Sequence, residues 1–337
     1  MVDRRTLLKG SAALVAGSAL AGCGRESQAP PWSPEAYTRP DRSAVAVLRA
    51  DAYDGRLVDI VRRGLELFAL ELAGRRIVLK PNFVEFDPNG AVNTSPALIA
   101  ATIEAFRSLG ASEVIVAEGP GHRRDTEYIV TASGLYDTLR DTKARYVNLN
   151  ADRLRRVPAR SRYSKLGTLY LPETVLGADL LVSMPKLKTH HWAGVTLSMK
   201  NLFGIMPWAV YGWPKNVLHY AGIVPSILDI NASLPVPRFN IVDGIVGMEG
   251  NGPIQGQPRQ SGLIVFGGDP VAVDATATRL MGLDAARIAY LSEAARFLGN
   301  ADPAAIEQRG ETPDGLQQSY APSPGFEGLA IARATGA

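Results

Sequence analysis

The chain has 337 residues, a formal net charge of +3 and a single cysteine, Cys23. Residues 1–22 hold three basic residues and one acidic residue, so the remainder carries a formal charge of only +1. Such a small excess argues against a general nucleic-acid binder, and we expect no nucleic-acid partner. One cysteine cannot supply a four-cysteine zinc site or an iron–sulfur cluster, so any metal would depend on histidine and carboxylate ligands.

The N-terminal residues have the pattern of an export signal. Residues 3–9 (DRRTLLK) have the pattern of a twin-arginine signal, and the apolar run 11–20 is too short to span a bilayer. The following Leu-Ala-Gly-Cys ends at Cys23 and matches the cleavage pattern of a lipoprotein, although a lone buried cysteine in a core helix is the alternative. We therefore expect export by the twin-arginine machinery and a lipid on Cys23. That lipid would hold the protein on the outer face of an envelope membrane, at the periplasmic side or the cell surface.

The predicted elements alternate between short apolar runs and longer amphipathic ones. The runs read as strands are 44–48, 76–80, 113–117, 145–149, 179–184, 239–243 and 262–267. One helix is expected to begin at Ser95-Pro96 and end before Gly110, and another to begin at Asp269-Pro270 and end near Gly282. Residues 153–171 are expected to form a basic hairpin that turns around 165–167.

This alternation predicts an α/β fold with a mostly parallel sheet and flanking helices, possibly as two lobes around a central cleft. The predicted organisation is a signal peptide over 1–22, a lipidated and flexible tether over 23–42, an α/β domain over 43–300 and a C-terminal extension over 301–337.

Ionisable groups and glycines follow the predicted strands. They occur in the segments 80–82, 118–122, 185–191, 243–253 and 268–270. Because ligands bind outside the carboxyl ends of strands in open α/β sheets, we expect these loops to share one crevice.

The segment 185–191 (PKLKTHH) is the richest of these loops in cations. If it is extended, Lys186, Lys188 and His190 share one face, which suits a carboxylate or phosphate. A solvated strand edge is the alternative. Downstream, 195–203 is expected to be a short helix that ends at Gly204 and places Thr196 and Lys200 on one face.

Several motifs together resemble the DUF362 family of uncharacterised proteins. They are KPN at 80–82, MPKLKTHH at 184–191, MKNLFG at 199–204, DGIVGMEGNGP at 243–253 and GGDPVAVDA at 267–275. The resemblance covers most of residues 44–297. Several members of the family carry ferredoxin-type cysteine clusters, which this chain lacks.

A second stretch resembles lactate racemase. His190 is followed by an Ala-Gly pair and, ten residues on, by Lys200. In that family the corresponding positions hold a catalytic histidine and the lysine that tethers a nickel-pincer nucleotide. His122 matches the other catalytic histidine, and His219 lies where a nickel-binding histidine would. The chain departs from lactate racemase at 197–199, which replaces Ser-Gly-Gly, and at 80–82, which replaces a phosphate-binding loop.

These patterns predict an exported enzyme that acts on a small anionic metabolite by proton or hydride transfer. His122 and His190 would be its acid–base residues, and Lys200 a nucleophile or a cofactor tether. A group of cations and amides would hold anionic parts of substrate or cofactor: Lys80, Asn82, Lys186, Lys188 and Asn201. The cofactor would contain a divalent metal, as a nickel-pincer nucleotide or in another form.

Two other functions remain open. A metal-dependent hydrolase or transferase would use His219, Asp243 and Glu249 on phosphate or carboxylate substrates. Asp243 and Glu249 could equally hold the glycine-rich loop closed. A non-catalytic lipoprotein that binds an anion is the third possibility.

Overall fold

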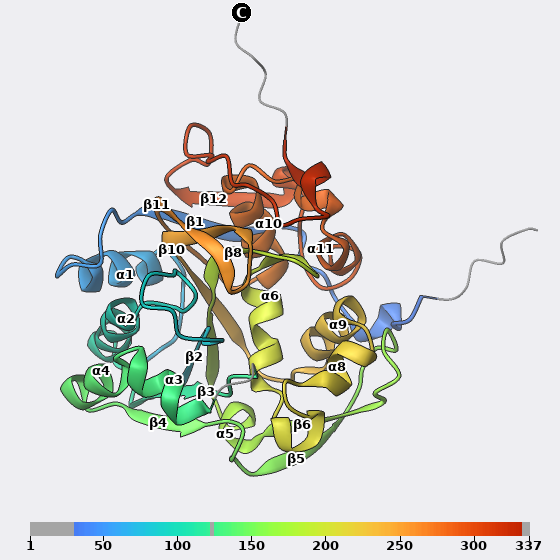
Figure 1. Ribbon diagram of the computed structural model, residues 1–337, viewed down its shortest axis with the longest axis horizontal. Helices are drawn as coiled ribbons and strands as arrows, with labels where there is room; N and C mark the ends of the chain where they lie inside the picture. The colour runs from blue at the N-terminus through green and yellow to red at the C-terminus, as the bar shows by residue number, and fades with distance from the viewer. Residues whose placement is uncertain (1–29, 122–124, 332–337) are drawn as a thin grey trace, which may run out of the picture. The chain divides into compact units, whose positions relative to one another are not determined.

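The fold is described for residues 30–121 and 125–331 by a computed structural model of the protein (Figure 1). Two residues of interest, Cys23 and His122, lie outside these ranges. From Trp32 onward the described chain belongs to one compact unit, and the possible division into two lobes is not seen. Among the described residues, none of the helices combines the length and the apolar character that crossing a membrane requires.

A mixed, mostly parallel sheet forms the centre of the fold. Its main path runs through β12 (Ile306–Gly310), β1 (Ser43–Arg49), β11 (Gln255–Gly267), β10 (Arg238–Asn251), β7 (Leu180–Met184), β2 (Arg76–Pro81), β3 (Glu113–Glu118) and β4 (Arg145–Asn148). Neighbours from β10 to β4 are parallel, whereas β11 is antiparallel to both β10 and β1. The seven strands predicted from the sequence are confirmed.

Helices cover both faces of this sheet (Figure 1). One side carries α1 (Leu57–Glu66), α2 (Pro96–Ser108), α3 (Thr126–Ala132) and α4 (Leu135–Thr142). The other carries α6 (Ser198–Asn201), α9 (Ile223–Ser233), α10 (Pro270–Leu280) and α11 (Ala289–Ala294). Successive strand residues serve opposite cores: Ile77 and Leu79 belong to one and Val78 to the other. Burial on both faces explains why these strands read as continuous apolar runs.

The smaller elements complete the chain. They are η1 (Pro34–Ala36), the antiparallel hairpin of β5 (Leu154–Pro158) and β6 (Thr168–Pro172), α5 (Glu173–Leu176), η2 (Leu202–Ile205), α7 (Trp208–Tyr211), α8 (Asn216–Tyr220), η3 (Ala285–Arg287), η4 (Pro303–Ala305) and η5 (Glu327–Leu329). The basic hairpin is confirmed, but its connection is a longer loop over 159–167, with Gly167 in the left-handed region at φ 62° at its end.

The two predicted helix starts are built differently. Asp269 caps α10, because its carboxylate accepts the N–H groups of Val271 and Ala272. Ser95 precedes α2 but makes no side-chain cap, and its N–H donates instead to Asp243 Oδ2 at 2.9 Å. That bond ties the start of α2 to the central strand β10.

The segment 185–191 is extended as predicted, but the helix predicted over 195–203 is wrong in its first half. β8 (Lys186–His190) lies parallel to β10, and β9 (Gly194–Thr196) returns antiparallel to β8. β-branched Val195 and Thr196 suit a strand, and the helix α6 begins only at Ser198. The glycine-rich loop also differs from expectation, because 247–251 continues β10 and only the tip of the β10–β11 hairpin forms a turn.

The segments that flank the predicted domain pack against it. Trp32 stacks on Phe297 with ring centres 4.7 Å apart, and Tyr37 meets the same ring edge-on. The expectation of a free tether up to residue 42 is therefore wrong for residues 32–37, because burial of these aromatic rings holds them in place. In the C-terminal extension, β12 adds a parallel edge strand to β1.

Candidate functional site

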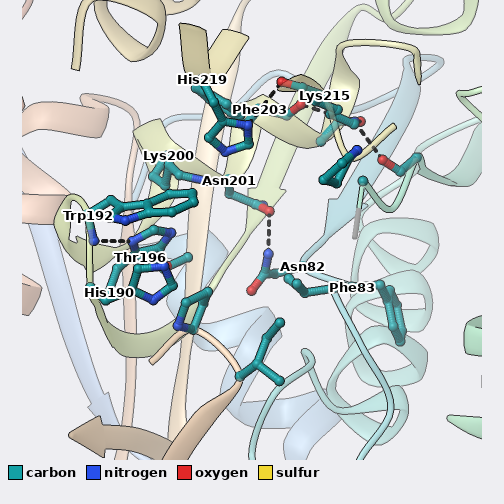
Figure 2. Close-up of a pocket in the computed structure, with 18 of the residues that line it drawn as sticks. Asn82, Phe83, His190, Trp192, Thr196, Lys200, Asn201, Phe203, Lys215 and His219 are labelled. Atoms are coloured by element: carbon teal, nitrogen blue, oxygen red, sulfur yellow. Dashed lines mark hydrogen bonds between the residues drawn. The ribbon is translucent and has the colours of Figure 1, made fainter. Parts of the chain in front are cut away.

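A cavity of about 590 Å³ lies beyond the carboxyl ends of β2, β3 and β8 (Figure 2). Its described lining includes three histidines (His190, His191 and His219), three lysines (Lys80, Lys200 and Lys215), and the polar side chains of Asn82, Thr196, Asn201 and Asn216. Phe83, Trp192, Phe203, Tyr220, Pro253 and Ile254 contribute much of the apolar surface. None of the described lining residues is acidic. The cavity therefore favours an anion.

The floor of the cavity is held by one buried ion pair. Lys80 Nζ lies 2.7 Å from Glu118 Oε2, and both side chains are almost fully buried. Glu118 also accepts the N–H groups of Phe83 and Gly119. Burial lowers the pKa of Lys80, and Glu118 opposes this shift. The pair links the ends of β2 and β3, and its positive and negative charges almost cancel.

Two asparagines extend this floor. Asn201 donates to Lys80 O and Ser183 Oγ, which turns its Oδ1 towards Lys80 Nζ and Asn82 Nδ2, at 3.1 and 3.2 Å (Figure 2). Asn82 Oδ1 is buried and has no partner among the described residues, and Thr196 Oγ1 is in the same condition. Buried polar atoms without partners are uncommon, and these two lie in residues that line the cavity. They are suited to bind a ligand that carries hydrogen-bond donors or a hydroxyl group.

Lys200 is the cation that the cavity leaves available. Its Nζ lies 4.3 Å from the centre of the Phe203 ring, and it makes no hydrogen bond to any described residue. Burial, and then the charge of Lys80, lower the pKa of Lys200 to about 8. An anion that enters the cavity would relieve this unfavourable environment.

Lys215 is buried beside the cavity in a different way. Its Nζ donates to three backbone carbonyls, those of Gly119, Gly204 and Phe203, at 2.7, 2.9 and 3.2 Å. Burial lowers its pKa well below the ordinary value. A Cβ on Gly121 would lie 2.6 Å from Lys215 Cε, so the glycine is needed for the lysine stem to pass.

His190 is a hydrogen-bond donor towards a ligand. Its Nδ1 accepts the N–H of Trp192 at 3.0 Å (Figure 2), so the proton of the neutral ring is on Nε2. Burial, followed by the charge of Lys200, lowers the pKa of His190 well below the ordinary value. The ring is therefore neutral near pH 7, with an N–H free to donate.

His191 and His219 have the opposite arrangement. The Nδ1 of His191 lies 2.8 Å from Gly252 O, and that of His219 lies 3.0 Å from Lys215 O. A carbonyl only accepts, so each Nδ1 carries the proton and each Nε2 keeps a lone pair. Burial and Lys200 lower the pKa of His219. Trp192 meets both rings edge-on, at 4.6 and 5.2 Å between centres.

Two predicted anion-binding lysines do not line this cavity. Lys186 is paired with Asp243 at 2.7 Å and donates to the Tyr53 hydroxyl at 2.9 Å. Lys188 is completely buried and donates to the carbonyls of Val92 and Pro253. β8 is buried along its whole length, so Lys186 and Lys188 contact neighbouring segments, and of the three predicted cationic residues only His190 lines the cavity.

The three metal ligands proposed from the sequence are not brought together. Asp243 is buried with Lys186, and Glu249 accepts Ala321 N–H at 3.0 Å and lies 3.5 Å from Arg259. His219 lines the cavity, apart from both. Within 30–121 and 125–331, no group of three or more His, Cys, Asp or Glu residues could hold a metal ion. Glu249 thus ties its strand to the C-terminal segment.

Comparison with known proteins shows the family to which this chain belongs. A family model described as "Domain of unknown function (DUF362)" matches residues 77–279. The chain belongs to the DUF362 family. The elements that build the cavity, β2, β3, β7, β8 and α6, lie within the matched DUF362 residues except for Arg76, the first residue of β2.

One curated relative is the thylakoid-associated protein sll1697 of Synechocystis sp. It is 27% identical over 261 residues, which are 75% of this chain and 79% of the relative. Two solved structures are also similar. Lactate racemase apoprotein from Thermoanaerobacterium thermosaccharolyticum has 15% identity and a TM-score of 0.46, and a Thermotoga maritima protein has 14% and 0.44. They align with 73% and 69% of this chain, and the chain spans only 59% and 60% of their lengths.

Some residues of the DUF362 cavity were missed from the sequence. Strict alternation along an extended segment predicts His191 on the face opposite His190, but β8 ends at His190 and both histidines line the cavity. Lys215 and Glu118 received no role. Glu118 could have been noticed as a carboxylate that directly follows an apolar strand run, whereas Lys215 stands in a loop with no recognisable pattern.

A buried acid sets the position of α6 and hence of Lys200. The carboxylate of Asp274 on α10 accepts the N–H groups of Ser198 and Met199 at 2.7 and 2.9 Å. Burial raises the pKa of Asp274 from 3.8 to about 7. This DUF362 protein therefore places an ionisable group beneath its cavity that titrates near neutral pH.

Asp274 should make stability depend on pH. Its pKa in the folded state is raised, so its contribution is complete at acid pH and is lost as the pH rises through about 7. We expect the free energy of unfolding to fall by on the order of 2–4 kcal/mol between pH 5 and 8. Asp274→Asn should flatten this profile, while Asp137→Asn, at an exposed ion pair, should retain it. Urea unfolding at several pH values measures both, and an unchanged slope in Asp274→Asn would contradict the assignment.

Proposed function

We propose that this DUF362 protein is an enzyme that acts on a small anionic metabolite by proton transfer. One observation carries the proposal: imidazoles of opposite hydrogen-bonding character share a cavity with Lys200, whose ammonium has no ion-pair partner among the described residues. His190 presents an N–H, while His191 and His219 each keep an Nε2 lone pair. Proton removal at one atom and proton delivery or hydrogen bonding at another require such a pair.

Lys200 would bind the anionic group of the substrate. Its ammonium has no competing partner among the described residues, and the lining brings no carboxylate that would repel an anion. With the anion held there, His190 Nε2–H would donate to a hydroxyl or carbonyl oxygen. His219 or His191 would then remove a proton from the neighbouring carbon or hydroxyl group. His190 thus acts as a hydrogen-bond donor, whereas the sequence predicted that it would be an acid–base residue together with His122.

The residues present fit part of what the lactate racemase resemblance implies for a cofactor. Lys200 offers a primary amine inside the cavity, and His219 offers a metal-binding Nε2 on a ring fixed through its Nδ1–H to a carbonyl. A bound nickel-pincer group would supply the hydride-transfer chemistry that side chains lack. By contrast, the ligands of the metal-dependent hydrolase are separated, which weighs against that alternative.

The protein is further proposed to be exported and lipid-anchored at Cys23. The support is the order of the N-terminal motifs, with paired arginines, an apolar run and a small-residue site before cysteine. The name of the Synechocystis relative, a thylakoid-associated protein, agrees with attachment to a membrane.

The histidine roles can be tested by nuclear magnetic resonance of ¹⁵N-labelled histidine. We expect His190 as the Nε2–H tautomer, and neutral at pH 7, because burial lowers its pKa. His191 and His219 should be Nδ1–H tautomers. Single His→Gln variants assign the signals. A charged His190 at pH 7, or a proton on its Nδ1, would refute the assignment.

Catalysis can be tested by measuring the exchange of substrate hydrogen with D₂O on a panel of 2-hydroxy acids. His219→Gln should slow exchange by about 10² or more if its ring is the base. Anion binding without exchange for any member of the panel would favour the non-catalytic alternative.

Anion binding should depend on the charge of Lys200. Titration calorimetry with L-lactate and inorganic phosphate should show affinity falling as the pH rises through about 8, because the neutral amine no longer attracts an anion. Lys200→Met should weaken binding about tenfold, and Lys200→Arg should remove the pH dependence. Lys165→Met, at an exposed turn, is the matched control. Binding that is the same at pH 7 and 9 would exclude this role.

Intact mass of protein from its own host tests the anchor and the tether together. A chain that begins at Cys23 with a diacylglycerol and acyl groups is expected, and Cys23→Ser should lack the lipid. Extra mass that disappears in Lys200→Met would mark a group attached to the cavity lysine. A chain that still begins at residue 1 would rule out the lipoprotein assignment.

A further inference from the structure

The mouth of the cavity carries an unusual number of exposed aromatic side chains. Of the nine large hydrophobic residues that are exposed in the described chain, six fall between residues 192 and 220. We call them the aromatic rim: Trp192, Trp208, Val210, Trp213, Val217 and Tyr220. Tyr220 is 88% exposed and Trp192 57% exposed. A gathering of this kind on a soluble surface marks a site of interaction.

The rim borders the entrance rather than another part of the surface. Trp192 and Tyr220 line the cavity themselves, and Trp213 precedes Pro214, which also lines it. The rings of Trp208 and Trp213 are 6.1 Å apart, and α7 packs against α8, which carries Val217 and Tyr220. Whatever covers the rim therefore lies directly over the opening.

The residue types of the aromatic rim favour contact with the interfacial region of a bilayer. Tryptophan and tyrosine combine an apolar ring with a polar group and are enriched where a membrane meets water. The chain has no acidic residue between Asp179 and Asp229, so no carboxylate in this stretch would repel anionic lipid headgroups.

The first described residues contact α9, and the other end of that helix contacts α8. Tyr37 donates to Ala232 O near the end of α9, and Ser226 near its start donates to Leu218 O on α8. α9 has 11 residues and so is about 16 Å long. Cys23 precedes Trp32 by nine residues, which reach at most about 30 Å when extended. A lipid on Cys23 would thus keep the rim within reach of the membrane.

We propose that the aromatic rim docks on the interfacial region of the bilayer, so that the cavity opens onto lipid. The substrate would then be an amphiphile that partitions into the membrane, with its anionic end at Lys200 and its apolar part against Trp192, Phe203 and Ile254. The substrate class rests on the proposed function. The docking itself does not.

Fluorescence can test the docking, because three of the four tryptophans belong to the rim. The full chain would carry Cys23→Ser, to prevent lipidation, and Trp32→Phe, to silence the remaining tryptophan while keeping a ring on Phe297. Vesicles of phosphatidylcholine and phosphatidylglycerol would be compared with vesicles whose acyl chains are brominated. We expect quenching only by the brominated lipid, since this requires the rings to enter the bilayer.

Variants separate the rim from other contacts. Val217→Ser with Tyr220→Ser should weaken vesicle binding about tenfold or more. Tyr128→Ser with Ile331→Ser, which alters exposed residues elsewhere, should not change it. Thermal unfolding confirms that each variant folds.

Three results would overturn the proposal. The first is equal fluorescence in both kinds of vesicle, and the second is quenching that the rim variant leaves unchanged. The third is a dimer in sedimentation velocity that the rim variant dissociates, without quenching by lipid, because this would show a second copy of the chain on the rim. Lys200→Met should weaken phosphate binding about tenfold but keep the quenching, so failure of the catalytic proposal can be told from failure of the docking.

Discussion

The main constraint on the structure around the cavity is the burial of several lysine ammonium groups with few carboxylates to neutralise them. Lys80 is balanced by Glu118, whereas Lys188 and Lys215 have only backbone carbonyls. Burying an ammonium is costly unless it is paired or fully hydrogen-bonded. Consequently the backbone around these side chains must approach closely and in fixed geometry. Among the described lysines of this cluster, Lys200 differs because its ammonium has neither a carboxylate nor a carbonyl partner.

Glycines and buried acids supply that geometry. A Cβ on Gly204 would lie 2.4 Å from Lys80 Nζ, so the glycine after α6 admits the lysine beneath it. Asp274 holds the start of α6 from the opposite side through two N–H groups. Asp243 performs a similar task at β10, where it joins Lys186, Tyr53 and the start of α2. These buried acids thus serve to position the cavity, and in the proposed function the imidazoles carry the proton transfer.

Residues that line the cavity lie directly beside residues of the aromatic rim. The same short segment that carries His219 towards the interior exposes Val217 and Tyr220 on α8. His191 and Trp192 follow one another in the same way, one holding a lone pair in the cavity and the other forming part of its edge. Because a helical turn and a strand end each send adjacent residues in different directions, binding chemistry and docking surface can share a few residues.

Local periodicity and turn chemistry were enough to predict the strands, the N-cap of α10 and the crowding of ionisable groups at strand ends. The sequence also carried the DUF362 motifs and the expectation that His190 and Lys200 share a site. Which of the described cations are free depends instead on long-range packing. Lys186 and Lys188 have the same local pattern as an open anion site, but β10 and the segment around Val92 bury them. The tautomers of the histidines were decided in the same way, since each depends on a backbone N–H or carbonyl that the fold brings to one ring nitrogen.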